Sequence, residues 1–420
     1  MIVLDIILSG IKIVVLLGVL ITIHELGHFI VAKLSKVKVN QFAIGFGPII
    51  FQKQTKETKY ALRLIPLGGF VSMEGEEGDS EVSNSFAKAK MYKKILIVAA
   101  GAIVNIVFAI IIYFILSATS GTYVSNEVGD LIENYAAEEI GIQVNDKLIE
   151  LNGKKIKNKR NLDEISKDFT GENLEIKVNR NGEILKYDLK PTEQKSMSTG
   201  MYLGENSEIL VVEKDSTAEK AGILANDELI KVNNVDVNGD PYKALELISN
   251  VTPEVKTLNL TIKRNDKILN LDVETNFVSS YYIGLIFKEA EDTLINRMIN
   301  GVMQTEEFVG SSILNLKQLF TGNVSVNQMM GPVGISEVVA KTDGVREFFE
   351  MLALISLSLG ITNLLPIPAL DGGKIVILLI EIVRRKPMKK ETEINIQLLG
   401  FSILIALSLY VTFNDIIRIF

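Results

Sequence analysis

The stretch "ITIHELGHFI", from Ile21 to Ile30, places two histidines and a glutamate inside an otherwise apolar run. That run extends from Ile6 to Leu34 and exceeds the roughly 20 residues that span a bilayer as a helix. At the bilayer centre an ionisable side chain costs on the order of 2.5 kcal/mol or more, unless it is paired or faces a cavity. The stretch therefore predicts a transmembrane helix that carries a functional site.

A cleaved signal peptide is the alternative interpretation of this first segment. Its apolar core would be about 7 to 15 residues long and would precede a cleavage site of small residues. The sequence "VAKLSKVKV" that ends the run is a poor match to such a site. A retained transmembrane helix is therefore favoured.

The composition favours a membrane protein with a sizeable water-exposed part. The 420-residue chain is 47% hydrophobic, and its mean hydropathy is +0.27. The net charge of -7 argues against a nucleic-acid partner, because a nucleic-acid binder normally presents a basic face to phosphates. The chain has no cysteine and only two histidines, so a metal site must be built from His, Asp and Glu.

Three further apolar segments predict three more transmembrane helices. They cover Ile95 to Ala118, a span that begins near Phe348, and Ile396 to Phe413. In a four-span fold, the basic loops between spans one and two and between spans three and four lie on the same side. The positive-inside rule makes that side cytoplasmic, so the segment from about Thr119 to Arg346 is predicted to face outward.

The outward segment contains an internal repeat. "AAEEIGIQVNDKLIELNG" begins at Ala136 and "TAEKAGILANDELIKVNN" begins at Thr217. Each copy predicts a short helix that ends at a glycine, an Asn-Asp turn and an alternating strand. The pattern resembles PDZ domains of the bacterial kind, which bind extended peptides at a sheet edge. A tandem pair could instead act as a size filter over a membrane entrance, and the sequence leaves both roles open.

The motif "HELGH" has the spacing of a zinc hydrolase site. Residues four apart lie on one face of a helix, so His24 and His28 can direct their imidazoles at one ion. Glu25 points to a neighbouring sector, where it can accept a proton from the attacking water. Zinc lowers the pKa of such a water to about 7. Both histidines of the chain lie in this motif, which argues against a chance match.

A catalytic zinc site needs a third protein ligand. The histidines are used and cysteine is absent, so this ligand must be Asp or Glu. "NLLPIPALDGGKI" places Asp371 among prolines and glycines that break a helix, and broken helix at membrane depth is tolerated chiefly where it lines a cavity. Asp371 is therefore the predicted third ligand. A helix N-cap is the alternative role for this residue, and it is compatible with metal binding.

These motifs together resemble the site-2 protease family of intramembrane zinc metalloproteases. The resemblance rests on "HELGH" in the first span, "NLLPIPALDGG" in the third, and the PDZ insertion between spans two and three. The tandem PDZ pair is most similar to the regulator of sigma-E protease branch. "RLIPLGGFVSMEGE", Arg63 to Glu76, resembles the membrane-associated β-hairpin of that branch, and "GPVGI", Gly331 to Ile335, resembles the stretch before its third span.

The resemblance implies roles for individual residues. His24, His28 and Asp371 would bind Zn2+, and Glu25 would be the general base. Asn363 would contact the substrate backbone or the scissile carbonyl. The chain departs from the family pattern in the second span, where "GAIVN", Gly101 to Asn105, has Ala102 in place of a proline. This difference puts a local kink of that helix in doubt.

The predicted hairpin has a substrate-binding interpretation. Gly68, Gly69 and Phe70 lie in "LGGFVSM", which combines turn glycines with an alternating strand. In this family such a strand could pair with an unwound substrate helix by edge addition. That step matters because a peptide bond inside a helix is shielded by its own hydrogen bonds. An ordinary cytoplasmic hairpin is the alternative.

The expected fold is a multi-pass α-helical membrane protein with four transmembrane helices, two inserted α+β PDZ domains and a membrane-associated β-hairpin. Residues 291–345 are expected to form amphipathic linker helices on the outer membrane surface, or alternatively a spacer packed on the PDZ pair. The predicted domains are an N-terminal membrane domain, two PDZ domains, the linker and a C-terminal membrane domain, at 1–118, 119–200, 201–290, 291–345 and 346–420.

The predicted function is zinc endopeptidase activity on single-pass transmembrane proteins in a bacterial plasma (inner) membrane. The resemblance implies an anti-sigma factor or signal-peptide remnants as substrates. Membrane lipid and a peptide ligand of the PDZ domains are further expected partners, and no nucleic acid is expected. A catalytically silent PDZ scaffold is the rival of another class. A transporter is a third possibility, which the lack of inverted hydropathy repeats disfavours.

Overall fold

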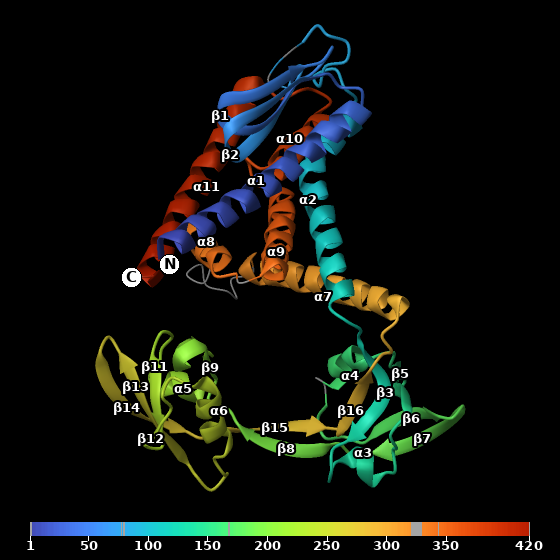
Figure 1. The fold of residues 1–420 in the computed structure, drawn as a ribbon, viewed down its shortest axis with the longest axis vertical. Coiled ribbons are helices and arrows are strands. Elements are labelled where there is room, and N and C mark those ends of the chain that lie inside the picture. Colours follow the sequence, from blue (N-terminus) through green and yellow to red (C-terminus); the bar gives the residue numbers. More distant parts are fainter. Residues whose placement is uncertain are drawn as a thin grey trace. The chain divides into compact units, whose positions relative to one another are not determined.

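The computed structural model describes residues 2–76, 78, 80–166, 169–320, 330–342 and 344–419. It divides into two compact units, which are treated separately below (Figure 1). Unit 1 comprises residues 1–122 and 291–420, and unit 2 comprises residues 123–290. Unit 1 is mainly helical, and unit 2 is rich in short strands.

Three helices of unit 1 are long and apolar enough to cross a membrane, among the residues that the structure describes. The apolar segments cover Leu8–Leu34 in α1 (Ile2–Leu34), Met91–Thr119 in α2 (Met91–Thr119) and Lys390–Ile417 in α11 (Lys390–Ile419). These helices contain the predicted first, second and fourth spans. The structure therefore agrees with a helical integral membrane protein.

The predicted third span is divided into two helices. α9 (Val345–Asn363) and α10 (Asp371–Arg384) are separated by residues 364–370, which include Pro366 and Pro368. A proline lacks the N–H that a helix interior needs, so the prolines account for the break. α9 is not among the three candidate spans, since three charged residues lie in its first two turns. A fourth span therefore remains a prediction.

The predicted hairpin forms two long antiparallel strands, β1 (Val39–Gln54) and β2 (Lys59–Met73). Both strands bend, so residues 39–44 pair on one side with 69–73 and on the other side with 59–62. Residues 51–54 then pair with 59–62. The four segments lie in the order 69–73, 39–46, 59–65 and 49–54. Residues 69–73 therefore form an edge that has no strand partner on its outer side, within the described chain.

Two further helices complete unit 1, α7 (Leu294–Phe320) and α8 (Pro332–Ala340). α7 packs against the end of α2, where the rings of Tyr113 and Phe308 stack with centroids 4.0 Å apart. Apolar residues in its first turn, Leu294 and Ile295, are exposed, and the position of this helix on the membrane surface stays a prediction. The rest of the predicted linker includes residues 321–329 and 343, which lie outside the described residues.

Unit 2 contains the predicted repeat as two successions of equivalent elements. Gly141 and Gly222 adopt φ of +84° and +85°, and Asn145 and Asn226 adopt φ of +76° and +69°. Matched left-handed residues show that the two copies turn in the same way. The first copy consists of β3 (Val124–Leu131), α3 (Ala136–Glu139), β4 (Lys147–Leu151), β5 (Lys154–Lys155), α4 (Lys159–Ser166), β6 (Leu174–Arg180) and β7 (Glu183–Leu189). The second copy consists of β10 (Ile209–Val212), α5 (Thr217–Lys220), β11 (Glu228–Val232), β12 (Val235–Asp236), α6 (Pro241–Ser249), β13 (Thr257–Arg264) and β14 (Lys267–Glu274).

Each copy is held by a buried aspartate paired with an arginine. Asp146 and Asp227 are both 1% exposed. Arg180 donates two hydrogen bonds of 2.7 Å to Asp146, and Arg264 makes the same bidentate pair with Asp227. Burial pushes the pKa of Asp146 up, but hydrogen bonds from Arg180 and the Gln143 N–H outweigh it, and the pKa is lowered overall.

The remaining strands of unit 2 connect the two copies. β8 (Thr192–Met197) pairs with β15 (Phe277–Tyr282), whereas β9 (Met201–Leu203) pairs with β10 in the second copy. β16 (Leu285–Glu289) follows the second copy in sequence but pairs antiparallel with β3 of the first. The first copy is therefore completed by a strand from the end of unit 2.

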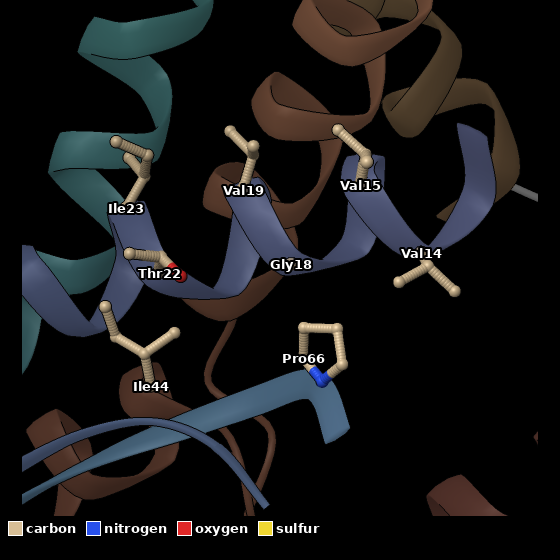
Figure 2. Close-up of a pocket in the computed structure, with 8 residues that line it drawn as sticks. All are labelled: Val14, Val15, Gly18, Val19, Thr22, Ile23, Ile44 and Pro66. Atoms are coloured by element: carbon tan, nitrogen blue, oxygen red, sulfur yellow. The ribbon is translucent and has the colours of Figure 1, made fainter. Parts of the chain in front are cut away.

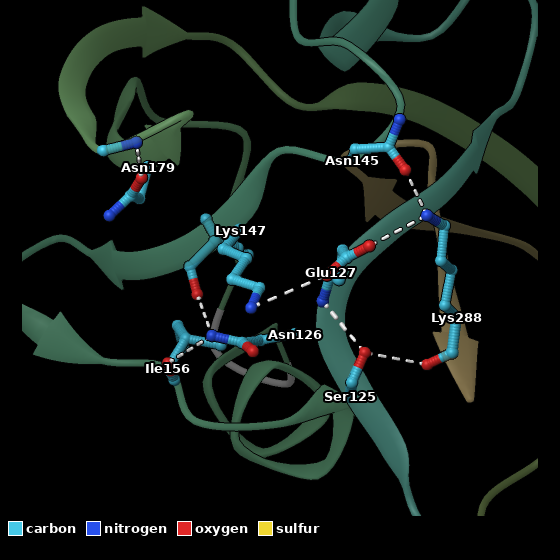
Figure 3. A network of polar contacts seen from close by, with 10 residues as sticks. Ser125, Asn126, Glu127, Asn145, Lys147, Ile156, Asn179 and Lys288 are labelled. Carbon is cyan, nitrogen blue, oxygen red and sulfur yellow. Dashed lines mark hydrogen bonds and ion pairs between the residues drawn. The ribbon is translucent and has the colours of Figure 1, made fainter. Parts of the chain in front are cut away.

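A polar network fixes β16 on the first copy (Figure 3). The Lys288 ammonium donates to Glu127 at 2.8 Å and also to Asn145, while Ser125 donates to the Lys288 carbonyl at 2.9 Å. The hydrogen bond from Lys288 is the main cause that lowers the pKa of Glu127. These contacts connect the start and the end of unit 2.

Candidate metal centre

The predicted zinc motif lies in the second half of α1. His24 and His28 are one helical turn apart, and their Nε2 atoms approach to 3.2 Å. The two rings meet edge to face with centroids 4.8 Å apart. Both side chains are largely buried, at 14% and 12% exposed. The helix therefore directs the two imidazoles at one point, as the i, i+4 spacing predicts.

Asp371 reaches the same point from α10. Its Oδ2 lies 3.3 Å from His24 Nε2 and 3.5 Å from His28 Nε2. Asp371 is the first residue of α10, and the preceding Leu370 is the N-cap. The alternative N-cap role of Asp371 therefore does not match the structure. α1, which carries His24 and His28, and α10, which begins at Asp371, both pack against α2. This shared packing brings the two motifs together although they are far apart in the sequence.

The loop before Asp371 is held tightly. A Cβ atom added at Gly372 or Gly373 would lie 2.1 Å from the Leu365 carbonyl oxygen or 2.4 Å from that of Ile367. Only glycine allows the loop to fold this closely onto the start of α10. From α11, Gln397 accepts a hydrogen bond of 2.6 Å from the N–H of Ala369. These contacts fix the carboxylate relative to the two imidazoles.

α2 supports the site from a second side. A Cβ added at Gly27 would lie 2.5 Å from the Ala100 carbonyl oxygen, and one at Gly101 would lie 2.3 Å from His28 Nε2. The two glycines thus let α1 and α2 approach at the level of the histidines. The Nδ1–H of His28 donates to the Ile97 carbonyl at 2.8 Å, which leaves Nε2 available for an ion.

The three ligand atoms fit a zinc ion. They all lie within 4.8 Å of one another, and the closest pairs are 3.2, 3.3 and 3.5 Å apart. Zn–N bonds of 2.0–2.1 Å in a tetrahedron give ligand separations of about 3.3 Å. Asp371 Oδ2 is buried and makes no hydrogen bond of good geometry with the described residues. Three potential ligand atoms that converge on one point are what a cation site requires.

Glu25 lies beside this centre, next to the edge segment of β2. Its carboxylate is in hydrogen-bonding reach of the Val71 N–H. A Cβ added at Gly69 would lie 3.3 Å from Glu25 Cγ, so the strand passes close to the glutamate. A Cβ at Gly68, where φ is +147°, would collide with the ring of Phe46. The predicted substrate-binding residues Gly68, Gly69 and Phe70 therefore lie on the strand edge nearest to Glu25.

An apolar cavity of about 420 Å³ runs along α1 up to the motif (Figure 2). Its residues come from α1 and from the hairpin, where Ile44 and Pro66 face the helix. The lining consists of Val14, Val15, Gly18, Val19, Thr22, Ile23, Ile44 and Pro66. Ile23, one of the lining residues, directly precedes His24 in α1, while His24, His28 and Asp371 are not part of the lining.

Two sequence expectations concern neighbouring positions. Asn363 is the last residue of α9 and is half-buried, and its contact with a substrate stays a prediction. α2 continues as a helix through Ala102, the position at which the family pattern has a proline. Sequence reasoning missed the Ile97 carbonyl and Gln397 as supports of the site. The glycine pair Gly27 and Gly101 was a usable signal for the close helix approach.

Comparison with known proteins places these observations in a family. The model of peptidase family M50 matches residues 12–407. A "Putative zinc metalloprotease" of Fusobacterium nucleatum is 30% identical over 413 residues, which cover 97% of this chain and 98% of the relative. The "Regulator of sigma-W protease RasP" of Bacillus subtilis is 29% identical, and the match covers 97% of this chain and 98% of that relative.

Similarity to solved structures is weak. The HtrA3 PDZ domain bound to a phage-derived ligand is 16% identical, with a TM-score of 0.19, and the match covers 21% of this chain and 94% of that domain. A similarity at this level does not assign the fold of unit 2. The family match, in contrast, extends over almost the whole chain. The predicted resemblance is thereby confirmed: the chain belongs to peptidase family M50, the site-2 protease family, as an integral membrane metalloprotease whose cofactor is Zn2+.

Proposed function

We propose that His24, His28 and Asp371 bind the zinc ion of an endopeptidase that cleaves within or near the bilayer. The observation that carries this proposal is the separation of their ligand atoms by 3.2–3.5 Å. These spacings suit three ligands of a tetrahedral zinc with one open position, which is the arrangement of catalytic rather than structural zinc.

Glu25 is the proposed general base. Bound zinc polarises the scissile carbonyl and makes a water nucleophilic at neutral pH. The Glu25 carboxylate accepts a proton from the attacking water and passes it to the leaving amide nitrogen as the C–N bond breaks. Glu25 follows His24 directly in α1, and the Val71 N–H lies within reach of the carboxylate. These features hold the carboxylate beside the metal without making it a ligand.

The edge segment 69–73 is the proposed docking site for an extended substrate. No strand pairs with its outer edge among the described residues, and such an edge can accept one further strand. Gly68, Gly69 and Phe70 would contact the substrate backbone, with Gly69 closest to Glu25. Strand addition would keep the scissile bond extended beside the metal. In a helical substrate the same bond would be shielded by the hydrogen bonds of the helix.

The apolar cavity along α1 supports a membrane-embedded substrate. Its lining is apolar apart from Thr22, so it suits the side chains of a transmembrane segment. Asn363, at the end of α9, is the proposed contact for the substrate backbone or the scissile carbonyl. We propose single-pass transmembrane proteins as substrates, including anti-sigma factors and signal-peptide remnants. The names of two relatives, regulators of sigma E and sigma W, support a role in regulated proteolysis.

The proposed topology has four spans, with α9 and the following loop and α10 as the third. The basic loops after α1 and after α10 are then cytoplasmic, and the active site lies towards that side of the bacterial plasma membrane. Unit 2 lies outside the cytoplasm as a tandem of PDZ domains with proposed boundaries 119–200 and 201–290. β16 lies inside the second range but pairs with β3, so the first domain is complete only when both are present.

Cleavage of a defined substrate tests this function. The full-length protein is reconstituted with a fluorescent single-span substrate, and wild type is compared with Glu25→Gln and with chelator-treated wild type. We expect both treatments to stop cleavage and added Zn2+ to restore the chelated wild type only. Cleavage that survives both treatments would rule out the zinc mechanism.

A further inference from the structure

The side chain of Asn105 lies fully buried in α2 against His24. It is 0% exposed, and its Nδ2 is 3.5 Å from His24 Nδ1. Its Oδ1 is buried and has no hydrogen-bond partner among the described residues. A buried amide oxygen without a partner is unfavourable, because no hydrogen bond offsets its loss of hydration. A half-turn of the amide would exchange its two ends, because they have the same shape.

The chemistry of a zinc-binding imidazole decides between these two orientations. If the amide nitrogen faced Nδ1, that ring atom would have to accept, and the proton of a neutral ring would be on Nε2. Nε2 is the atom that lies 3.3 Å from Asp371 and faces the metal centre. With the oxygen turned towards the ring, Nδ1–H donates to Oδ1 and Nε2 keeps a free lone pair. The second orientation therefore gives Oδ1 a donor and leaves Nε2 free to bind an ion.

We propose that Asn105 is a positioning residue, whose Oδ1 accepts the Nδ1–H of His24 and thereby fixes the ring for zinc. This proposal rests on the zinc site proposed above. His28 gives the internal comparison, because its Nδ1–H donates to the Ile97 carbonyl, which can only accept. Ile97 and Asn105 are eight residues apart on α2, about two turns. One helix thus orients both histidines through their second nitrogens.

The surroundings hold Asn105 in this place. From α9, the Ser356 hydroxyl donates to the Asn105 backbone carbonyl at 2.9 Å. A Cβ added at Gly360 would lie 2.8 Å from the Ala102 carbonyl oxygen, so α9 packs directly on α2. The backbone of Asn105 therefore has little freedom to move away from His24. The outer partners of metal-binding histidines typically contribute 10- to 100-fold in metal affinity.

Two isosteric variants separate positioning from packing. Asn105→Asp keeps an acceptor towards Nδ1–H but has no donor, whereas Asn105→Leu keeps the volume and has neither. Zn2+ affinity of the full-length protein in detergent is measured by competition with a chromophoric chelator. We expect Asn105→Leu to lose about 10- to 100-fold in affinity, and Asn105→Asp to stay within about threefold of wild type. Thr119→Ala, which removes a side-chain hydrogen bond to the Ile115 carbonyl at the far end of α2, is the matched control with unchanged affinity.

A nitrogen NMR measurement on the zinc-free protein tests the proposal without activity or metal. The chain has only two histidines, so ring-15N histidine labelling gives two assignable rings. We expect both wild-type rings to carry a proton on Nδ1, held by Asn105 Oδ1 in His24 and by the Ile97 carbonyl in His28. Asn105→Leu should give His24 a mixture of tautomers and leave His28 unchanged.

The proposal is overturned if wild-type His24 carries its proton on Nε2, or if Asn105→Leu changes neither the tautomer nor the affinity. Equal losses in Asn105→Asp and Asn105→Leu would show that the amide donates, which also contradicts it. If the wild type binds no zinc, the proposed metal site is refuted. The tautomer measurement is made without metal, so its outcome still tests the role of Asn105.

Discussion

Two kinds of buried carboxylate distinguish unit 1 from unit 2. In unit 2, Asp146 and Asp227 each pair with an arginine through two hydrogen bonds of 2.7 Å. In unit 1, Asp371 faces His24 and His28 at 3.3 and 3.5 Å and has no hydrogen bond of good geometry within the described chain. In unit 2 each buried carboxylate is paired with an arginine, and the pair stabilises the fold. A carboxylate that converges with two imidazoles, as Asp371 does, suits a cation-binding site.

The largest expected effect comes from removing the carboxylate in unit 1. Asp371→Ala should release zinc and abolish peptide cleavage, because only two protein ligands remain. Metal content after purification and cleavage of a single-span substrate are the measurements. Asp227→Ala removes a buried carboxylate from unit 2 and should keep one zinc per chain. Equal zinc contents in the two variants would contradict the distinction.

Glu25→Gln should reduce the cleavage rate by about 10²–10⁴-fold, the usual contribution of a general base. Zinc content should stay at the wild-type level, since Glu25 is not a ligand in this account. Single-turnover cleavage and metal analysis are made on the same preparation. Loss of zinc in this variant would place Glu25 among the ligands instead.

Breaking an arginine pair should affect stability and leave the metal centre intact. Arg264→Met leaves Asp227 buried and without its arginine, a change that typically costs about 3–5 kcal/mol. Hydrogen exchange of the full chain should show faster opening in unit 2, with unchanged zinc content. Arg297→Met, which breaks an exposed pair with Asp292, is the matched control and should leave stability nearly unchanged. Similar effects of both variants would contradict the structural role of the buried pair.

The smallest expected effect is a pH dependence confined to unit 2. The folded-state pKa of Asp146 is lowered, so the pair stabilises unit 2 above the unfolded pKa of about 3.9. This stabilisation is lost as the pH falls through the folded-state value. Asp146→Asn should flatten the decline of the unit 2 unfolding temperature between about pH 4 and pH 2. An unchanged decline would show that Asp146 does not contribute to it.

The sequence predicted the parts of the site that local spacing determines. His24, Glu25 and His28 follow from helical periodicity, and Asp371 follows from the prolines and glycines around it. The repeat in unit 2 was visible because its turn residues recur at a fixed separation. Such features depend on residues close together in the chain, or on copies of one another.

Contacts between distant residues could not be predicted in this way. Asn105 meets His24 across 81 residues, and Lys288 meets Glu127 across 161 residues. No local pattern specifies which helix or strand edge such a residue will meet. The division of the predicted third span into α9 and α10 depends on prolines that the sequence does contain. The break itself was predicted from these prolines, whereas the charged residues at the start of α9 leave the fourth span a prediction.

The most direct test of the zinc site is the position of the metal itself. Anomalous scattering at the zinc absorption edge from crystals of the full-length protein locates the ion. We predict one zinc with His24 Nε2, His28 Nε2 and an Asp371 oxygen at about 2.0–2.2 Å. A zinc bound elsewhere, or a zinc held by the histidines without Asp371, would contradict the account.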